Sequence, residues 1–98
     1  MTPRSTGRKD GNEKEIVNQC RKFGMLVIIQ SQYRAHDFDL LIGYRDAWLP
    51  FEVKKDKREK LRPRQAEFKE KCEAKGLPIY TVTNFETVMS VFDGLDGN

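Results

Sequence analysis

The sequence predicts a single α/β domain with the element order α-β-β-β-α-β-α. Its 98 residues suit one domain, and a hydrophobic fraction of 38% is enough for a globular core. Segments of helical periodicity alternate with short apolar runs, and glycine and proline separate them. We expect the domain to cover residues 11–93, between a flexible basic arm at 1–10 and a flexible tail at 94–98.

The first helix is expected over residues 12–23. Its apolar side chains recur at intervals of three and four residues, which predicts one buried face made of Ile16, Val17, Cys20 and Phe23. Asn12 is a candidate N-cap, and Gly24 is suited to end the helix.

Three strands are expected next, over residues 25–30, 37–42 and 47–54. The first run is continuously apolar, which is typical of a strand covered on both faces. The other two alternate, and a short turn at 43–46 joins them into an antiparallel hairpin. Because side chains alternate between faces, Asp39 and Glu52 can face the same side of the sheet.

A second helix is expected over residues 63–75, since proline suits a first turn and Gly76 with Pro78 ends the pattern. Its stripe includes one amide and consists of Leu61, Gln65, Phe68 and Cys72. A short strand follows at 79–82. Thr83 and Glu86 then have the spacing of a capping box for a last helix, with an apolar face of Phe85, Val88, Met89 and Phe92.

Composition excludes several classes of protein. No apolar run approaches the ~20 residues of a membrane span, and residues 1–11 contain no hydrophobic signal core, so we expect a soluble cytoplasmic protein. Two cysteines and one histidine cannot form a Cys/His zinc site or a disulfide framework. Cys20 and Cys72 are therefore expected to be reduced and buried.

The positive charge is concentrated in one segment. Residues 54–64 contain seven basic and two acidic residues, a net charge of +5, whereas the whole chain carries +3. Such a segment attracts polyanions such as nucleic acid, and the alternative is a solvated loop that keeps the protein soluble.

Two carboxylates interrupt the apolar strands. Placing Asp39 and Glu52 side by side is unfavourable unless a cation joins them, and Mg²⁺ prefers such oxygen ligands. The backbone carbonyl of Val53 would add a ligand. Lys54, one strand step from Glu52, would direct its ammonium to the same place, to orient an attacking water or stabilise charge on a phosphate.

These residues resemble a known signature. Asp39, followed after twelve residues by Glu52-Val53-Lys54, is similar to the motif of the PD-(D/E)XK nuclease superfamily. Segments 38–43, 51–54 and 61–65 resemble its VRR-NUC branch and small phage members, whereas 13–17 and 22–24 resemble the opening helix of archaeal Holliday-junction resolvases. The resemblance implies a restriction-endonuclease-like α-β-β-β-α-β core, a mixed sheet flanked by helices, here with an extra C-terminal helix.

The resemblance also implies roles. Asp39, Glu52 and Lys54 would form the catalytic triad, with Glu13 completing the acidic cluster and Gln65 as the glutamine of the following helix. The implied cofactor is Mg²⁺, with Mn²⁺ as a possible substitute, and the implied metal ligands are Asp39, Glu52, Val53 and Glu13. The DNA-binding residues expected from the basic segment are Lys55, Lys57, Arg58, Lys60, Arg62 and Arg64.

The sequence departs from the family pattern in two places. The run 36–39 (His-Asp-Phe-Asp) lacks the usual proline and offers Asp37 as a rival ligand, and Pro50 is unusual in an interior strand. His36 is expected to be a loop residue near DNA rather than a ligand. Trp48 and Tyr44 can either stack on bases or pack within the hairpin.

The sequence thus predicts a metal-dependent DNA endonuclease that selects four-way junctions or flaps. We expect a homodimer with no membrane association, in the cytoplasm of a bacterium or a phage-infected cell. Two alternatives remain open: a non-catalytic DNA-binding or assembly module that keeps the nuclease fold, and the nuclease core of a restriction or nicking system that works with a partner.

Overall fold

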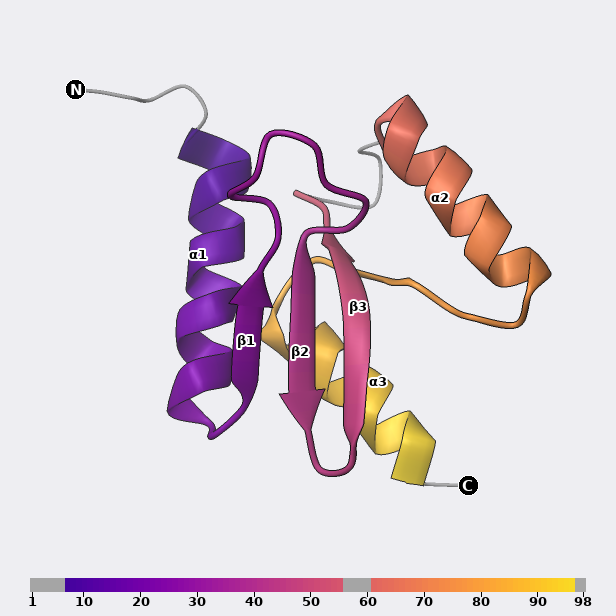
Figure 1. Ribbon diagram of the computed structural model, residues 1–98. Helices are drawn as coiled ribbons and strands as arrows, with labels where there is room; N and C mark the ends of the chain where they lie inside the picture. The colour runs from indigo at the N-terminus through magenta and orange to yellow at the C-terminus, as the bar shows by residue number, and fades with distance from the viewer. Residues whose placement is uncertain (1–6, 56–60, 97–98) are drawn as a thin grey trace.

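The computed structural model describes residues 7–55 and 61–96. Within these residues, three helices and a four-stranded mixed sheet follow one another in the predicted order (Figure 1). The elements are α1 (Gly7–Lys22), β1 (Leu26–Ile29), β2 (Leu40–Tyr44), β3 (Ala47–Val53), α2 (Pro63–Ala74), β4 (Tyr80–Val82) and α3 (Phe85–Asp96). The predicted α/β class, with a mixed sheet flanked by helices and a C-terminal helix, is confirmed.

The sheet has the strand order β1-β2-β3-β4. The first three strands are antiparallel neighbours, and β4 runs parallel to β3. The predicted hairpin joins β2 to β3 with Leu40 opposite Phe51 and Tyr44 opposite Ala47. Its turn is shorter than predicted, because Gly43 still belongs to β2 and only residues 45 and 46 lie outside the strands.

The hydrophobic core lies between one face of the sheet and the helices α1 and α3. Figure 1 shows α3 behind the sheet, while α1 runs alongside β1. The core consists of Ile16, Val17, Cys20, Met25, Val27, Leu40, Ile42, Phe51, Val53, Val82, Val88 and Phe92. Cys20 is free and fully buried, as expected, and burial raises the pKa of its thiol to about 11. Cys72 is free as well but only partly buried.

Strand β1 is an edge strand and is covered on one face only, contrary to the expectation. Leu26 is 64% exposed and Ile28 is 43% exposed, whereas Val27 points into the core. The backbone N–H of Gln30 is bonded to Asp39 O, so strand alternation directs the carbonyl of Val27 away from β2. Arg21 Nη2 donates a hydrogen bond to this carbonyl at 3.1 Å and thereby covers the outer edge of β1.

Helix α1 is longer than its apolar periodicity predicts. It begins at Gly7, so residues 7–10 are helical and not part of the expected basic arm, whose remaining residues 1–6 lie outside the described ranges. Asn12 is consequently not an N-cap. Its Nδ2 donates to the backbone oxygen of Lys54 at 2.9 Å and ties the helix to the end of β3. At the other end, Phe23 lies past the helix and is 49% exposed, and Gly24 follows with a φ of 101°.

Helix α3 also extends further than predicted, to Asp96, so residues 94–96 are helical and not tail. Its N-cap is Asn84, and the predicted capping box of Thr83 with Glu86 is wrong. Asn84 Oδ1 accepts hydrogen bonds from the backbone N–H and the hydroxyl of Thr87, at 2.8 and 2.5 Å. No helix within the described residues combines the length and the apolar character that a membrane span requires.

Two polar side-chain contacts join helix α2 to Asp39 and to β4. Gln65 is the only buried residue in this helix. One turn further on, Lys69 Nζ donates to Thr81 Oγ1 in β4 at 3.2 Å. Of the four residues predicted to form one face of this helix, Gln65 is buried. The other three, Leu61, Phe68 and Cys72, are half-buried.

Candidate active site

The predicted acidic residues lie at the end of the sheet where β1 and β3 end and β2 begins (Figure 1). Asp39 immediately precedes β2, and its backbone N–H is bonded to Phe51 O at 3.0 Å. The pairing of β2 with β3 ends at Leu40 and Phe51, so Asp39 adjoins the end of this ladder, close to the segment that carries Glu52. Asp39 and Glu52 are both 0% exposed, so two buried acidic residues lie at this end of the sheet.

Three groups surround the carboxylate of Asp39. The backbone N–H of Val53 donates to Oδ2 at 2.8 Å, and Gln65 Nε2 donates to Oδ1 at 3.4 Å. The ring of His36 approaches the same side, with Nε2 at 3.2 Å from Oδ1. Residues from a loop, a strand and a helix thus fix the position of this carboxylate.

Paired burial sets the electrostatics of Asp39 and Glu52. An ionised carboxylate loses much of its hydration on burial, and two of them side by side also repel each other. A shared cation removes both penalties, and carboxylate and carbonyl oxygens are the donors that Mg²⁺ accepts. The donor set of Asp39, Glu52 and the Val53 carbonyl is therefore chemically suited to a divalent cation.

Lys54 follows directly after β3 with its backbone held from two sides. Its N–H is bonded to Val82 O at 2.9 Å, and its carbonyl accepts the hydrogen bond from Asn12. The half-buried Lys54 lies two positions beyond Glu52, so strand alternation places both on one side of the sheet. The association of the Lys54 ammonium with the acidic residues stays a prediction.

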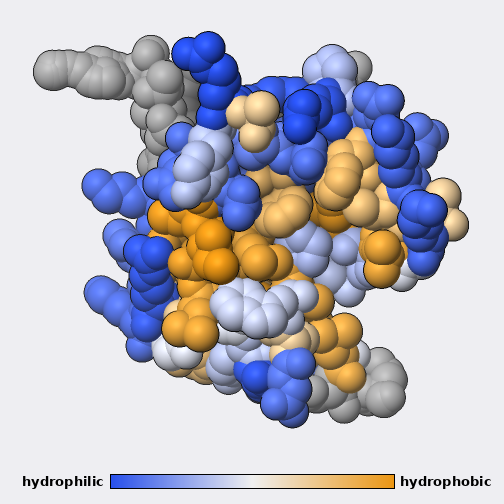
Figure 2. All heavy atoms as spheres, in the orientation of Figure 1, coloured by the Kyte–Doolittle hydropathy of each residue, from blue (hydrophilic) through white to orange (hydrophobic). Residues whose placement is uncertain are grey.

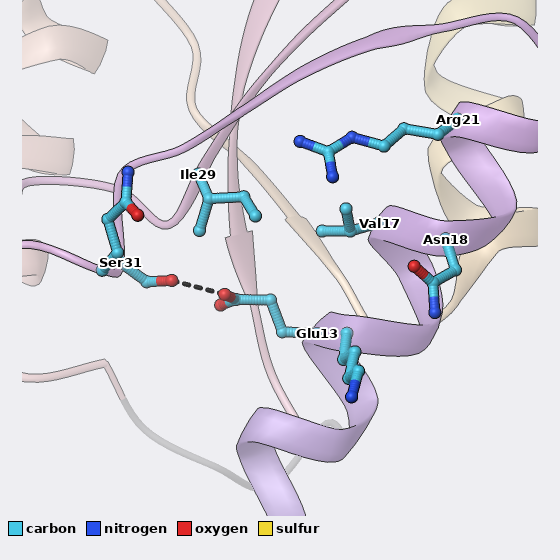
Figure 3. A pocket seen from close by; sticks show the side chains of 8 residues that line it. Glu13, Val17, Asn18, Arg21, Ile29 and Ser31 are labelled. Carbon is cyan, nitrogen blue, oxygen red and sulfur yellow. Dashed lines mark hydrogen bonds between the residues drawn. The ribbon is translucent and has the colours of Figure 1, made fainter.

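Glu13 approaches from α1. Its carboxylate accepts a short hydrogen bond from the hydroxyl of Ser31, in the loop after β1 (Figure 3). It lines a pocket of about 470 Å³ between α1 and the end of β1. Within the described ranges, no three His, Cys, Asp or Glu side chains are arranged to hold a metal ion together. Glu13 is accordingly near this end of the sheet but not in a preformed cluster with Asp39 and Glu52.

Asp37 differs sharply from Asp39. Its Oδ1 accepts a hydrogen bond from Arg64 Nε at 3.0 Å, and both side chains are exposed by a third or more. Arg62 and Lys55 are exposed as well, and their contact with DNA stays a prediction. The other predicted DNA-binding residues, Lys57, Arg58 and Lys60, lie outside the described residues.

Two residues near the site were not assigned to it from the sequence. Ser31 holds Glu13, and His36 is buried against Asp39 instead of lying at the surface near DNA. Both belong to residues 30–39, which form no helix or strand and therefore show no periodicity that predicts orientation. The spacing of His36 and Asp39 by three residues is the only hint the sequence offers.

Comparison with known proteins places this geometry in a family of folds. No protein-family model and no curated protein matches the sequence. Two solved structures do match: a "VRR_NUC domain" with 25% identity and a TM-score of 0.66, over 88% of this chain and 95% of that one, and a "VRR_NUC domain protein" with 18% identity and a TM-score of 0.60, over 96% and 89%. The chain has a VRR-NUC-like nuclease fold.

The VRR-NUC-like fold accounts for nearly all of the described chain, since both matches extend over most of its length. The resemblance drawn from segments 38–43, 51–54 and 61–65 is confirmed at the level of fold. The neighbours indicate a nuclease domain as the class of protein.

Proposed function

We propose that this domain is a metal-dependent DNA endonuclease that uses Mg²⁺, with Mn²⁺ as a substitute. The observation that supports this most strongly is the burial of Asp39 and Glu52 at the same end of the sheet in a VRR-NUC-like fold. The exposed basic residues Lys55, Arg62 and Arg64 adjoin this pair and are suited to the phosphate backbone.

Each residue of the proposed site has a distinct task. Asp39, Glu52 and the Val53 carbonyl would hold the cation, which when bound supplies charge neutralisation and lowers the pKa of a coordinated water. Lys54 would orient the attacking water or stabilise the charge that develops on the phosphate. Gln65 would act as a positioning residue, because its amide donates a hydrogen bond to the carboxylate of Asp39.

Glu13 is proposed as the further acid of the site. Its carboxylate is held by Ser31 at the same end of the sheet, and α1 is fixed there by the bond between Asn12 and Lys54 O. Of the two candidate acids before β2, Asp37 and Asp39, we propose Asp39 as the metal ligand. Asp37 is exposed and paired with Arg64, so its carboxylate is engaged in holding α2.

We expect the substrate to be a branched DNA, a four-way junction or a flap. Within the described residues, every helix and strand belongs to the nuclease fold, so no separate element enters a groove to read base edges. DNA shape would then govern the choice of substrate.

The purified domain should therefore cleave a four-way junction or a flap faster than linear duplex or single strand, at one fixed salt concentration. Cleavage should require Mg²⁺ or Mn²⁺ and stop with EDTA. Failure to cut any of these DNAs with either metal would overturn the endonuclease, and tight binding without cutting would favour the non-catalytic module. Equal cleavage rates on all substrates would contradict only the proposed selectivity for branched DNA. Activity that appears only with a captured partner would indicate a restriction or nicking system.

The exposed apolar face of the sheet supports the proposal of a homodimer. Leu26, Ile28 and Trp48 are 64, 43 and 52% exposed, and the register places them on one face. Figure 2 shows apolar side chains gathered on this side of the molecule. The ring of Trp48 lies flat on Gly43, where a Cβ would come within 2.9 Å of it. A second copy would cover this surface, which monomeric proteins seldom leave open.

Ile28→Glu is expected to weaken the dimer by about 100-fold or more, because it places a charge in the centre of the apolar face. Sedimentation velocity over a range of concentrations measures the change. Leu77→Glu is the matched control, since Leu77 is 56% exposed but lies in the connection between α2 and β4. A parent protein that stays monomeric at every concentration, or an Ile28→Glu dimer as tight as the parent, would contradict the proposal.

A further inference from the structure

The imidazole of His36 is the least expected group at this end of the sheet. The residue belongs to the loop that connects β1 to β2, is 9% exposed, and has its ring against Asp39. The ring nitrogens have different surroundings. Nδ1 lies 3.0 Å from the backbone oxygen of Tyr33, whereas Nε2 forms no hydrogen bond within the described residues.

The contact with Tyr33 settles which nitrogen carries the proton. A carbonyl oxygen only accepts hydrogen bonds, so Nδ1 must be the donor. When Nε2 carries no proton, it is an acceptor atom that lies 3.2 Å from the carboxylate oxygen Oδ1 of Asp39. Two acceptor atoms at this distance repel each other unless a proton or a metal ion lies between them.

The distance between the two atoms fits adjacent ligands of one ion. Metal–nitrogen and metal–oxygen bonds to such ligands are about 2.1 Å long, so two ligands at a right angle lie about 3.0 Å apart. A ring whose second nitrogen donates to a backbone carbonyl also has the support usual for a metal-bound histidine. The geometry of His36 and Asp39 meets both conditions.

We propose that His36 is a metal ligand that binds, through Nε2, the same divalent ion as Asp39. Because the described residues hold no ready-made group of three such side chains, His36 and Asp39 are the two side chains already in place for the ion, and the other ligands move to it on binding. This inference rests on the metal-dependent function proposed above and deepens it. The site would then combine nitrogen and oxygen donors instead of oxygen donors alone. First-row transition metals accept imidazole more readily than Mg²⁺ does, so the site would prefer ions such as Mn²⁺ or Co²⁺.

The structure permits a direct test because His36 is the single histidine of the sequence. The full chain, without a histidine tag, is labelled with ¹⁵N-histidine, loaded with Mn²⁺ and measured by electron spin echo envelope modulation. Coordination predicts a ¹⁵N coupling that is absent from unlabelled protein. Its absence from the labelled, Mn²⁺-loaded protein would overturn the inference, and this measurement needs no substitution that might disturb folding.

Binding affinities provide the second measurement. His36→Gln should weaken Co²⁺ binding by about tenfold or more and change Mg²⁺ binding by less than about threefold. Asp37→Asn is the matched control and should leave both affinities unchanged, since Asp37 pairs with Arg64. Equal losses for both metals would instead indicate an imidazolium that positions Asp39, and would overturn ligation.

The two proposals fail in different ways. If the wild-type protein cleaves DNA with Mn²⁺ but shows no ¹⁵N coupling, histidine ligation is contradicted and the nuclease proposal stands. If it shows the coupling but cleaves no DNA with any metal, histidine ligation stands and the nuclease proposal is contradicted.

Discussion

Glu52→Gln is expected to lower the rate of DNA cleavage by about 10³-fold or more while the protein stays folded. The amide keeps the shape of the side chain but removes the charge that would hold a cation opposite Asp39. Thermal unfolding should occur at the same temperature as in the parent or a higher one, because one of two adjacent buried carboxylates is neutralised. Single-turnover cleavage and a melting curve on the same preparation measure both effects.

Asp37→Asn is the appropriate control for this charge removal. It also neutralises an acid near β2, but one that is exposed and paired with Arg64. Its effect on cleavage should stay within about tenfold, since exposed ion pairs contribute little. Parent-like activity in Glu52→Gln, or equal losses in the two variants, would show that the buried pair is not the catalytic centre.

Phe92→Ala is expected to cause the largest loss of stability among single substitutions away from the site. Phe92 is 1% exposed, and its ring lies 5.5 Å from Tyr44 and 5.9 Å from Phe51, so it joins α3 to the sheet. Its truncation should reduce the free energy of unfolding by about 3–5 kcal/mol, out of about 5–15 for a domain of this size. The melting temperature should fall by about 15 °C or more.

The control for this substitution lies on the same helix. Leu95 is 48% exposed, so Leu95→Ala should change the free energy of unfolding by less than about 0.5 kcal/mol. Because α3 covers the face of the sheet opposite to Asp39 and Glu52, the folded fraction of Phe92→Ala should cleave DNA at nearly the parental rate at low temperature. Denaturant titration and cleavage at 4 °C separate the two properties, and equal destabilisation by both substitutions would refute the assignment of α3 to the core.

The elements with clear periodicity could be predicted from the sequence. Ile16, Val17 and Cys20 recur at helical spacing and do form the buried face of α1. The alternation around Glu52, together with the short turn of the hairpin, was sufficient to predict that Asp39 and Glu52 share a side of the sheet. Both patterns are local, because the helix and strand backbones determine to which side each residue in turn points.

Other features depend on contacts between distant segments. The apolar run of β1 has the same composition whether a strand is covered by its own chain or is left exposed, so the exposure of Leu26 and Ile28 could not be inferred. The extension of α1 through Gly7 and Gly11 runs against the low helix propensity of glycine. His36 lies in an irregular loop, where the sequence does not specify which side chains turn inward.

The guanidinium of Arg21 has a consequence for how copies of this chain can associate. By occupying the outward carbonyl of Val27, it blocks the addition of a further strand at this edge of the sheet. Association through the apolar face, by contrast, buries a finite surface and ends once two copies have met. Growth by strand addition at the β1 edge is thus disfavoured, whereas the proposed two-fold association through the apolar face stays accessible.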